Sequence, residues 1–427
     1  MTTGFGIAVL RGGAVLAPAM LTAVLWLVTP SVRVRAAAVL AALWNVVGLL
    51  VVNAIAVRSG WWAFGTDGSM WSGVPADVVV GWALLWGAVP ILLTPWVNPL
   101  VTGLVLVVGD VFAMAALEPL VVLQSRWWWG ELSAVTTCLL PGLLLGWATA
   151  TGRLLRVRAV LQVVIFGAVL LFVLPTIAFV YTGNSWAAVI SGVGGPVDLV
   201  LIQVAAVLAV IALRAVADFV RSGGTPYPWD PPSRLVTGGP YAYVANPMQL
   251  CAVAMLVIAA AVSGRPALLL AAAIGAVFGS GLAGWHESQQ LRERFGDGWL
   301  AYRRSVRNWW PRLQPYPGRS SARLYVGVNC DPCSAVGAWI ARRRHPTLEI
   351  CAAEDHREPL RRVRYEDADG LVCSGTRALG AALEHLSLGY AVLGWLIRAP
   401  GLAWLVQVLA DAVGGGPREI ARPDRSG

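Results

Sequence analysis

Long apolar stretches alternate with short polar ones from the start of the chain to about residue 286, and this spacing predicts a helical membrane bundle. A helix needs about 20 mostly apolar residues to cross the hydrocarbon core of a bilayer. By this measure we expect about nine transmembrane helices. They are predicted near residues 8–28, 36–57, 77–94, 99–123, 131–151, 158–181, 198–219, 247–263 and 267–286. From Arg323 onward the apolar runs are shorter and charged residues more frequent, which predicts a small soluble domain.

Composition and charge indicate the class of protein and its orientation in the membrane. Of the 427 residues, 57% are hydrophobic and only 13% are charged, which is far from the composition of a soluble domain. The formal net charge of +9 comes from Arg alone, and most of the Arg residues fall in loops on one side of the predicted helices. The positive-inside rule then places the amino terminus outside the cell (inner or plasma) membrane and everything after Glu287 in the cytoplasm. This charge favours contact with lipid headgroups, so we expect no nucleic-acid partner.

The chain divides by composition into four parts. We expect an N-terminal transmembrane region at 1–182, a second membrane module at 183–311, a Pro-, Gly- and Ser-rich linker at 312–322, and a cytoplasmic domain with its tail at 323–427.

Two Trp-rich hairpins in the N-terminal region look like copies of each other. Trp61-Trp62 and Pro75 are echoed by Trp127-Trp128-Trp129 and Pro141. They are interpreted either as an aromatic belt at the membrane interface or as a duplicated module that is faintly similar to bacterial carotenoid and lycopene cyclases. Asp110 is the most deeply placed ionisable residue of this region, and an interior position would mark a polar cavity.

The most specific pattern has two halves around a predicted helical pair. The first half, GGPYAYVANPMQL, begins at Gly238, and Asn246-Pro247 within it suits the start of a helix, with Asn as its cap. The second half, HESQQLRERFGDGWLAYRRSVRNWWP, begins at His286 and is amphipathic. Taken separately, the halves indicate no more than a capped helix and a membrane-surface helix. Both halves fall on the predicted cytoplasmic side, where a water-soluble cofactor can reach them.

From about residue 223 to 315 the chain resembles isoprenylcysteine carboxyl methyltransferase and the phospholipid methyltransferases. The resemblance implies a wholly helical membrane enzyme that binds S-adenosylmethionine from the cytoplasm. Position by position, it implies these cofactor-binding residues: Gly239, Pro240, Tyr241, Asn246 and Pro247 in the first half, and Glu287, Phe295, Gly296, Trp299 and Tyr302 in the second. Aromatic faces and a carboxylate suit a sulfonium cation. The chain departs from the family pattern at Ala245, Gln249, Ser288 and Trp299, which puts the family's substrate in doubt.

The C-terminal domain carries a different candidate chemistry. The sequence ARLYVGVNCDPCSAVGAWIARRR predicts a strand, a turn with Cys330 and Cys333, and a helix. A CxxC pair at a helix start is typical of thiol–disulfide exchange, because helix-start amides favour the thiolate. Half of a metal site or two inert thiols are the alternatives, and no metal site is predicted. The domain also resembles a small thioredoxin-like family of thiol–disulfide oxidoreductases, which implies a dithiol or disulfide protein as partner.

The sequence therefore predicts an all-α polytopic bundle of about nine helices, followed by a small α/β thioredoxin-like domain. Our leading hypothesis is an integral membrane methyltransferase that uses S-adenosylmethionine on a membrane lipid, an isoprenoid or another hydrophobic small molecule. One alternative is a membrane-tethered thiol–disulfide oxidoreductase with a non-catalytic bundle. The other is a carotenoid or isoprenoid cyclase-like enzyme.

Overall fold

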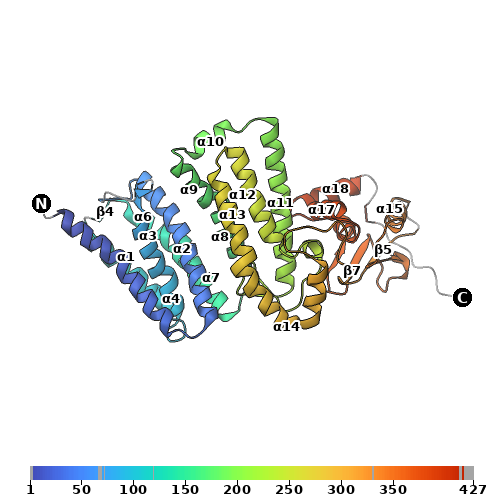
Figure 1. Ribbon diagram of the computed structural model, residues 1–427, viewed down its shortest axis with the longest axis horizontal. Coiled ribbons are helices and arrows are strands. Elements are labelled where there is room, and N and C mark those ends of the chain that lie inside the picture. The colour runs from blue at the N-terminus through green and yellow to red at the C-terminus, as the bar shows by residue number, and fades with distance from the viewer. Residues whose placement is uncertain are drawn as a thin grey trace. The chain divides into compact units, whose positions relative to one another are not determined.

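The computed structural model describes residues 3–65, 70–71, 73–118, 120–328, 331–412 and 416–417. It contains two compact units, which are described separately. The first comprises Met1–Leu174 and the short segment Thr225–Asp230; the second comprises Pro175–Gly224 and Pro231–Gly427 (Figure 1).

The first unit is a helical bundle around a central helix, α2, which packs against α3, α4, α6 and α7. Small residues permit this packing: a Cβ atom on Gly87 would lie 2.5 Å from the carbonyl oxygen of Ala41 in α2. The bounds are α1 (Thr3–Val28), α2 (Val32–Arg58), α3 (Ala76–Ala83), α4 (Val89–Leu92), α5 (Pro99–Ala116), α6 (Trp127–Ala134), α7 (Leu140–Thr151), α8 (Leu155–Ala168), β1 (Trp62–Phe64), β2 (Met70–Trp71), β3 (Val74–Pro75) and β4 (Val121–Leu123).

Three of the π-helical turns that the structure describes lie in helices before residue 182, at η1 (Leu84–Ala88), η2 (Val135–Leu139) and η3 (Val169–Val173). A proline follows each turn two residues later, namely Pro90, Pro141 and Pro175. Proline has no N–H, and its ring clashes with the carbonyl group four residues earlier, so a wider turn before it relieves the clash.

These turns change the comparison between the two Trp-rich hairpins. Pro75, which the sequence comparison aligned with Pro141, lies in β3 ahead of α3, whereas Pro141 lies inside a helix. Pro90 is the residue in the position equivalent to Pro141, because both follow a π-helical turn.

The helix expected near 99–123 ends earlier than predicted. It stops at Ala116, and Val121–Leu123 forms β4, which pairs antiparallel with β1. The sequence offers a reason, because a residue that precedes proline, here Glu118, disfavours the α conformation.

The second unit begins with membrane-type helices. Its bounds are α9 (Leu174–Tyr181), α10 (Trp186–Gly192), α11 (Pro196–Arg221), the short 3₁₀ helix η4 (Gly239–Ala242), α12 (Pro247–Ser263), α13 (Ala267–Phe278), the π-helical turn η5 (Gly279–Ala283) and α14 (Gly284–Ser305). Helix α12 packs between α11 and α13. The helix expected at 267–286 continues through η5 into α14, so the predicted membrane helix and the amphipathic helix after it are joined.

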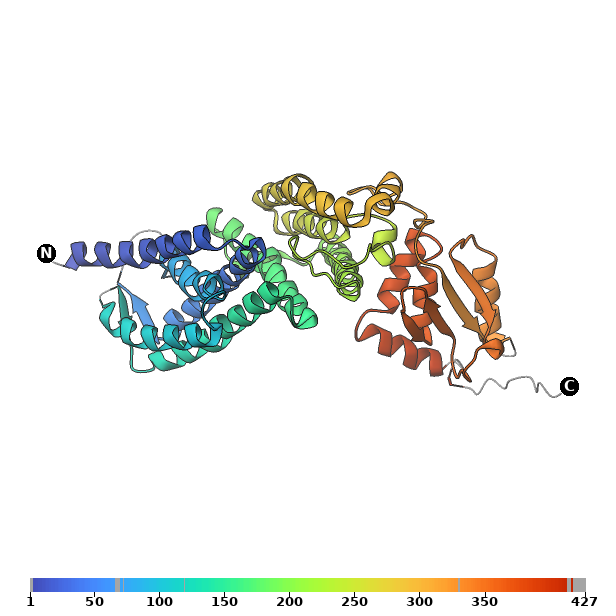
Figure 2. The ribbon, with the colours of Figure 1, turned by 90° about the horizontal axis from the view of Figure 1, so that it is seen from below.

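The C-terminal part of this unit is a four-stranded sheet with helices around it (Figure 2). The strand order is β6-β5-β7-β8, with β5 and β6 parallel and the other pairs antiparallel. The bounds are β5 (Ala322–Val326), β6 (Leu348–Ala352), β7 (Arg364–Asp367), β8 (Val372–Ser374), α15 (Asp331–Ala341), η6 (Ala353–Asp355), α16 (Thr376–Leu383), α17 (Leu388–Ile397) and α18 (Leu402–Ala410). Leu324 of β5, Tyr365 of β7 and Ala381 of α16 meet in its core. This arrangement is compatible with the expected small α/β domain, while its thioredoxin-like character stays a prediction.

Five of the described helices are long and apolar enough to cross a membrane. They are Gly6–Val28, Val32–Arg58, Trp127–Thr151, Leu155–Tyr181 and Pro196–Arg221. The other four predicted spans are shorter apolar helices, at Ala76–Leu92, Pro99–Met114, Pro247–Ser263 and Ala267–Gly281. Helices α17 and α18 form a pair bent by 92° that makes a sixth span if counted as one. The number of nine spans therefore stays a prediction.

Candidate functional site

The first half of the signature is a turn that only glycine can make. Gly239 has φ +56°, and a Cβ atom there would lie 2.0 Å from Oδ2 of Asp218 in α11. L-residues avoid this left-handed region, and glycine enters it without strain. The turn leads into η4, in which Tyr241 is buried, and Tyr243 directly after η4 is buried as well.

Backbone hydrogen bonds join the two halves of the signature. The amide of Ala245 donates to the carbonyl of Arg307 at 2.9 Å, and the amide of Asn246 donates to the carbonyl of Asn308 at 3.3 Å. These contacts need no particular side chain. They bring together two segments that lie about 60 residues apart in the sequence.

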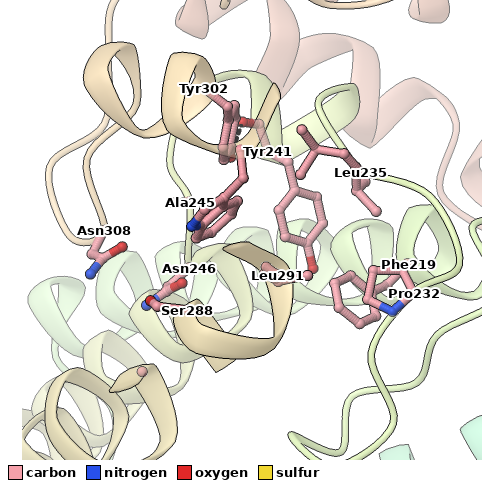
Figure 3. Close-up of a pocket in the computed structure, with 13 residues that line it drawn as sticks. Phe219, Pro232, Leu235, Tyr241, Ala245, Asn246, Ser288, Leu291, Tyr302 and Asn308 are labelled. Atoms are coloured by element: carbon pink, nitrogen blue, oxygen red, sulfur yellow. Dashed lines mark hydrogen bonds between the residues drawn. The ribbon is translucent and has the colours of Figure 1, made fainter. Parts of the chain in front are cut away.

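Aromatic side chains fill the space between the halves (Figure 3). The hydroxyl of Tyr302, which is only 2% exposed, donates to the carbonyl oxygen of Tyr241 at 2.8 Å. The ring of Tyr241 stacks on Phe219 at 5.7 Å between centroids, and the ring of Trp299 lies 5.8 Å from that of Tyr302. The buried hydrogen bond fixes the position of Tyr302 against the turn.

Gly296 interrupts α14 in the middle of the second half. Its φ of +49° and ψ of −124° are outside the helical region and accessible in practice only to glycine. The break separates Leu291 on one side from Trp299 and Tyr302 on the other, and all three line one cavity. Phe295 does not line that cavity; the guanidinium group of Arg294 lies 5.9 Å from its ring centroid.

The aromatic cavity has room for about one water-sized group, near 30 Å³. Of the predicted cofactor-binding residues, Tyr241, Asn246, Trp299 and Tyr302 line it. Gly239, Pro240, Pro247 and Gly296 instead shape the backbone around it, and the side chain of Glu287 lies outside the part of the chain that the structure describes. Residues that were not predicted to bind the cofactor complete the lining, among them Ala245 and Ser288, two of the departures from the family pattern; the others are Phe219, Pro232, Leu235, Val236, Gly284, Leu291 and Asn308.

Asn246 precedes α12 as expected but does not cap it. Its side-chain amide donates to Oε1 of Gln249 at 3.3 Å, and no hydrogen bond runs from its side chain to the helix-start amides of these described residues. The expectation of an Asn cap was therefore wrong. The Asn246–Gln249 pair also gives a structural role to Gln249, one of the departures from the family pattern.

A second cavity of about 410 Å³ adjoins the first, since Leu235 and Val236 line both. Its polar wall centres on Glu384, which is 3% exposed and pairs with Arg214 at 3.6 Å and with Arg319 at 3.8 Å. Arg398 contacts the same carboxylate. Burial acts to raise the pKa of Glu384, but the surrounding guanidinium groups outweigh burial and hold this pKa below its ordinary value.

The first unit contains a separate polar cluster. Asp110 and Glu131 are each 8% exposed, and the indole N–H of Trp82 donates to Asp110 at 2.9 Å. The two carboxyl groups also line a cavity of about 30 Å³ together with Trp62 and Trp86. Asp110 therefore faces the interior of the bundle, in a small cavity with mostly aromatic and aliphatic walls.

The predicted redox pair lies mostly outside the described residues. This applies to Cys330 and to the side chain of Cys333, whose backbone is in α15. Thiol–disulfide chemistry therefore stays a prediction.

Comparison with known families gives a match within the second unit. Residues 196–298 match the family model of phospholipid methyltransferase. No curated protein and no solved structure matches the chain. The matched segment runs from α11 into α14 and ends at Gly298, so Trp299 and Tyr302 follow it. The family match and the apolar helices together indicate an integral membrane protein with a phospholipid methyltransferase-like module at residues 196–298.

Proposed function

We propose that this module transfers the methyl group of S-adenosylmethionine to a lipid, an isoprenoid or another hydrophobic acceptor. The observation that carries the proposal is the aromatic cavity between the two signature halves, where a hydrogen bond joins Tyr302 to Tyr241. The family match at residues 196–298 supports the reaction class.

The lining of the cavity suits the reacting end of the cofactor. When bound, S-adenosylmethionine supplies an electrophilic methyl group on a sulfonium cation. Aromatic faces attract such a cation, and Tyr241, Trp299 and Tyr302 provide them. Methyl transfer by direct displacement depends on alignment and exclusion of water. The burial of Tyr241 and Tyr302 serves both requirements.

The small volume of this cavity limits what it can hold. About 30 Å³ is room for one small group, not for a nucleoside. The remainder of the cofactor must therefore occupy adjoining space or displace a wall. Helix α14 is the wall most suited to move, because its hydrogen-bonded ladder is already interrupted at Gly296.

Cofactor binding by the purified full-length protein tests this proposal. Titration calorimetry in detergent should show saturable binding of S-adenosylmethionine, and Tyr241→Ala should weaken it. Tyr181→Ala is the matched control, because Tyr181 is 87% exposed and does not line the cavity. Absence of saturable binding by the unaltered protein would refute the methyltransferase proposal.

The acceptor class is tested separately. Membranes that contain the protein are incubated with S-adenosylmethionine carrying a labelled methyl group and then extracted with organic solvent. Label in the lipid extract that disappears with Tyr241→Ala supports a hydrophobic acceptor. Label confined to the aqueous phase contradicts it.

A further inference from the structure

The second cavity has walls from both the membrane module and the C-terminal domain. Its volume of about 410 Å³ far exceeds that of the aromatic cavity beside it. The end of α11 and the Gly238-Gly239 turn form one side, and Asp367 and Asp369 from the sheet domain form another. All of these residues belong to the second unit.

Charged side chains of both signs line this cavity. They are four arginines, Arg214, Arg221, Arg234 and Arg319, and four carboxylates, those of Asp218, Asp367, Asp369 and Glu384. The arginines come from α11, the loop before the Gly238-Gly239 turn and the linker, whereas Asp367 and Asp369 come from the sheet domain. The α11 side is therefore suited to an anionic group and the sheet side to a cationic one.

Arg221 is the arginine of α11 that a ligand can reach. Its side chain is 36% exposed, against 13% for Arg214, and it contacts Asp218 through Nη2. A guanidinium group carries five N–H donors, so Arg221 can hold Asp218 and a ligand carboxylate together.

The sheet domain offers the opposite charge. Asp367 and Asp369 both line the cavity, and Asp369 accepts hydrogen bonds from Arg234 at 3.2 Å and from Ser320 at 2.5 Å. Asp367 is more buried than Asp369, and its carboxylate accepts a hydrogen bond from the amide of Leu371 at 2.8 Å. An ammonium group close to Asp367 would therefore face an available carboxylate.

We propose that this cavity binds the amino-acid end of S-adenosylmethionine, with its carboxylate on the α11 arginines and its ammonium group towards Asp367. The C-terminal domain then forms part of the cofactor site. This inference rests on the proposed methyltransferase function. It explains how a sulfonium methyl group reaches the small aromatic cavity, because the two cavities meet at Leu235 and Val236.

A comparison of two ligands tests the assignment without an activity assay. S-adenosylhomocysteine keeps the zwitterionic end, and 5′-methylthioadenosine lacks it. Titration calorimetry on the full-length protein should show that S-adenosylhomocysteine binds at least about tenfold tighter, since a charged hydrogen bond contributes about this factor. Arg221→Gln and Asp367→Asn should each remove most of that preference while binding of 5′-methylthioadenosine stays the same.

Arg323→Gln is the matched control for charge. Arg323 is an exposed arginine on β5 that pairs with Glu349 at 2.9 Å and does not line the cavity. It should leave both affinities unchanged. The melting temperature of each variant shows whether a lost preference reflects lost folding, and a variant that melts like the unaltered protein but keeps the full preference overturns the assignment.

The remaining outcomes separate three explanations. If the unaltered protein binds neither ligand, the methyltransferase proposal fails and this inference fails with it. If both ligands bind equally well, a cofactor site stands but the cavity does not hold the amino-acid end. A lipid phosphate is the competing anion: nanodiscs of anionic lipid that weaken S-adenosylhomocysteine binding relative to zwitterionic lipid, with Arg221→Gln abolishing the effect, would assign the arginines to headgroups instead.

Discussion

Replacing Gly239 by alanine adds one methyl group where the backbone and a neighbouring charge both exclude it. The left-handed φ of +56° costs an L-residue about 1–2 kcal/mol. The new Cβ atom would also lie 2.0 Å from Oδ2 of Asp218, so one of the two must move. Asp218 is held by Arg214 at 3.0 Å and by Arg221, and displacing a charged hydrogen bond costs about 1.5–3 kcal/mol. We expect Gly239→Ala to destabilise the second unit by about 2.5–5 kcal/mol in total.

The neighbouring glycine provides the control. Gly238 has φ −95°, and the nearest atom to an added Cβ, outside its chain neighbours, is Nη2 of Arg319 at 4.0 Å. Gly238→Ala should therefore change stability by less than about 1 kcal/mol. Thermal melting in detergent should show a drop of at least about 4 °C for Gly239→Ala, because 1 kcal/mol corresponds to about 2–4 °C in a unit of this size. S-adenosylhomocysteine affinity is measured in parallel. Equal melting temperatures for the two variants would refute the reasoning.

Three further predictions follow from single features of the structure. Gly296→Ala should lower the melting temperature, because its backbone conformation would strain an alanine by about 1–3 kcal/mol. Gly298→Ala, at a position with open space around it, should not lower the melting temperature. Similar shifts for the two variants would contradict the break in α14. Burial, with Arg319 and His345 nearby, holds the pKa of His385 well below its ordinary value. The unfolded chain therefore takes up a proton first, so the stability of the sheet domain should be full above about pH 6.5 and fall as the pH drops below it. Melting curves between about pH 5 and 8 should show a smaller pH dependence for His385→Gln, and an unchanged dependence would count against the buried neutral imidazole. Asp110→Leu should destabilise the first unit by about 1–3 kcal/mol more than Asp110→Asn, because only Asn keeps an acceptor for the indole of Trp82. Thermal melts followed by circular dichroism measure the stability of both variants. Equal losses of stability would show that this hydrogen bond is unimportant.

Helix positions were predictable from the sequence where local signals coincide with apolar runs. The helix expected at 247–263 is α12, Pro247–Ser263, because Pro247 suits a first helical turn and Gly264 takes the left-handed conformation at its end. The early end of α5 at Ala116 and the pairing of β4 with β1 were not predictable in this way, because a β-pairing between residues about 60 positions apart leaves no local signal.

The chemistry of the candidate site was predictable from the sequence, but only some of the residues that line it were. The motif identified Tyr241 and Tyr302, which the structure joins by a hydrogen bond. Phe219 and Asn308 were missed, because each is an ordinary residue of its segment and reaches the cavity only through tertiary packing. The requirement for glycine at two motif positions has the clearest physical reason, since Gly239 and Gly296 both have positive φ angles. A glycine requirement of this kind is visible in a sequence only after a motif has marked the position.

The contacts of the C-terminal domain bear on whether it can be an independent module. The hydroxyl of Tyr243, two residues after Tyr241 in the signature, donates to the carbonyl oxygen of Glu384 at 3.0 Å, and both residues are almost fully buried. The predicted linker is held as well, since the amide of Tyr316 donates to the carbonyl of Ala242 at 2.9 Å. The buried carboxylate of Glu384 contacts Arg214 of α11, Arg319 of the linker and Arg398 of the domain itself. A domain that was only tethered to the membrane module would not need such a shared contact. Removing one partner of this network leaves uncompensated buried charge. We therefore expect the signature turn and the sheet domain to depend on each other for stability. A cofactor site shared by the two parts would require this arrangement.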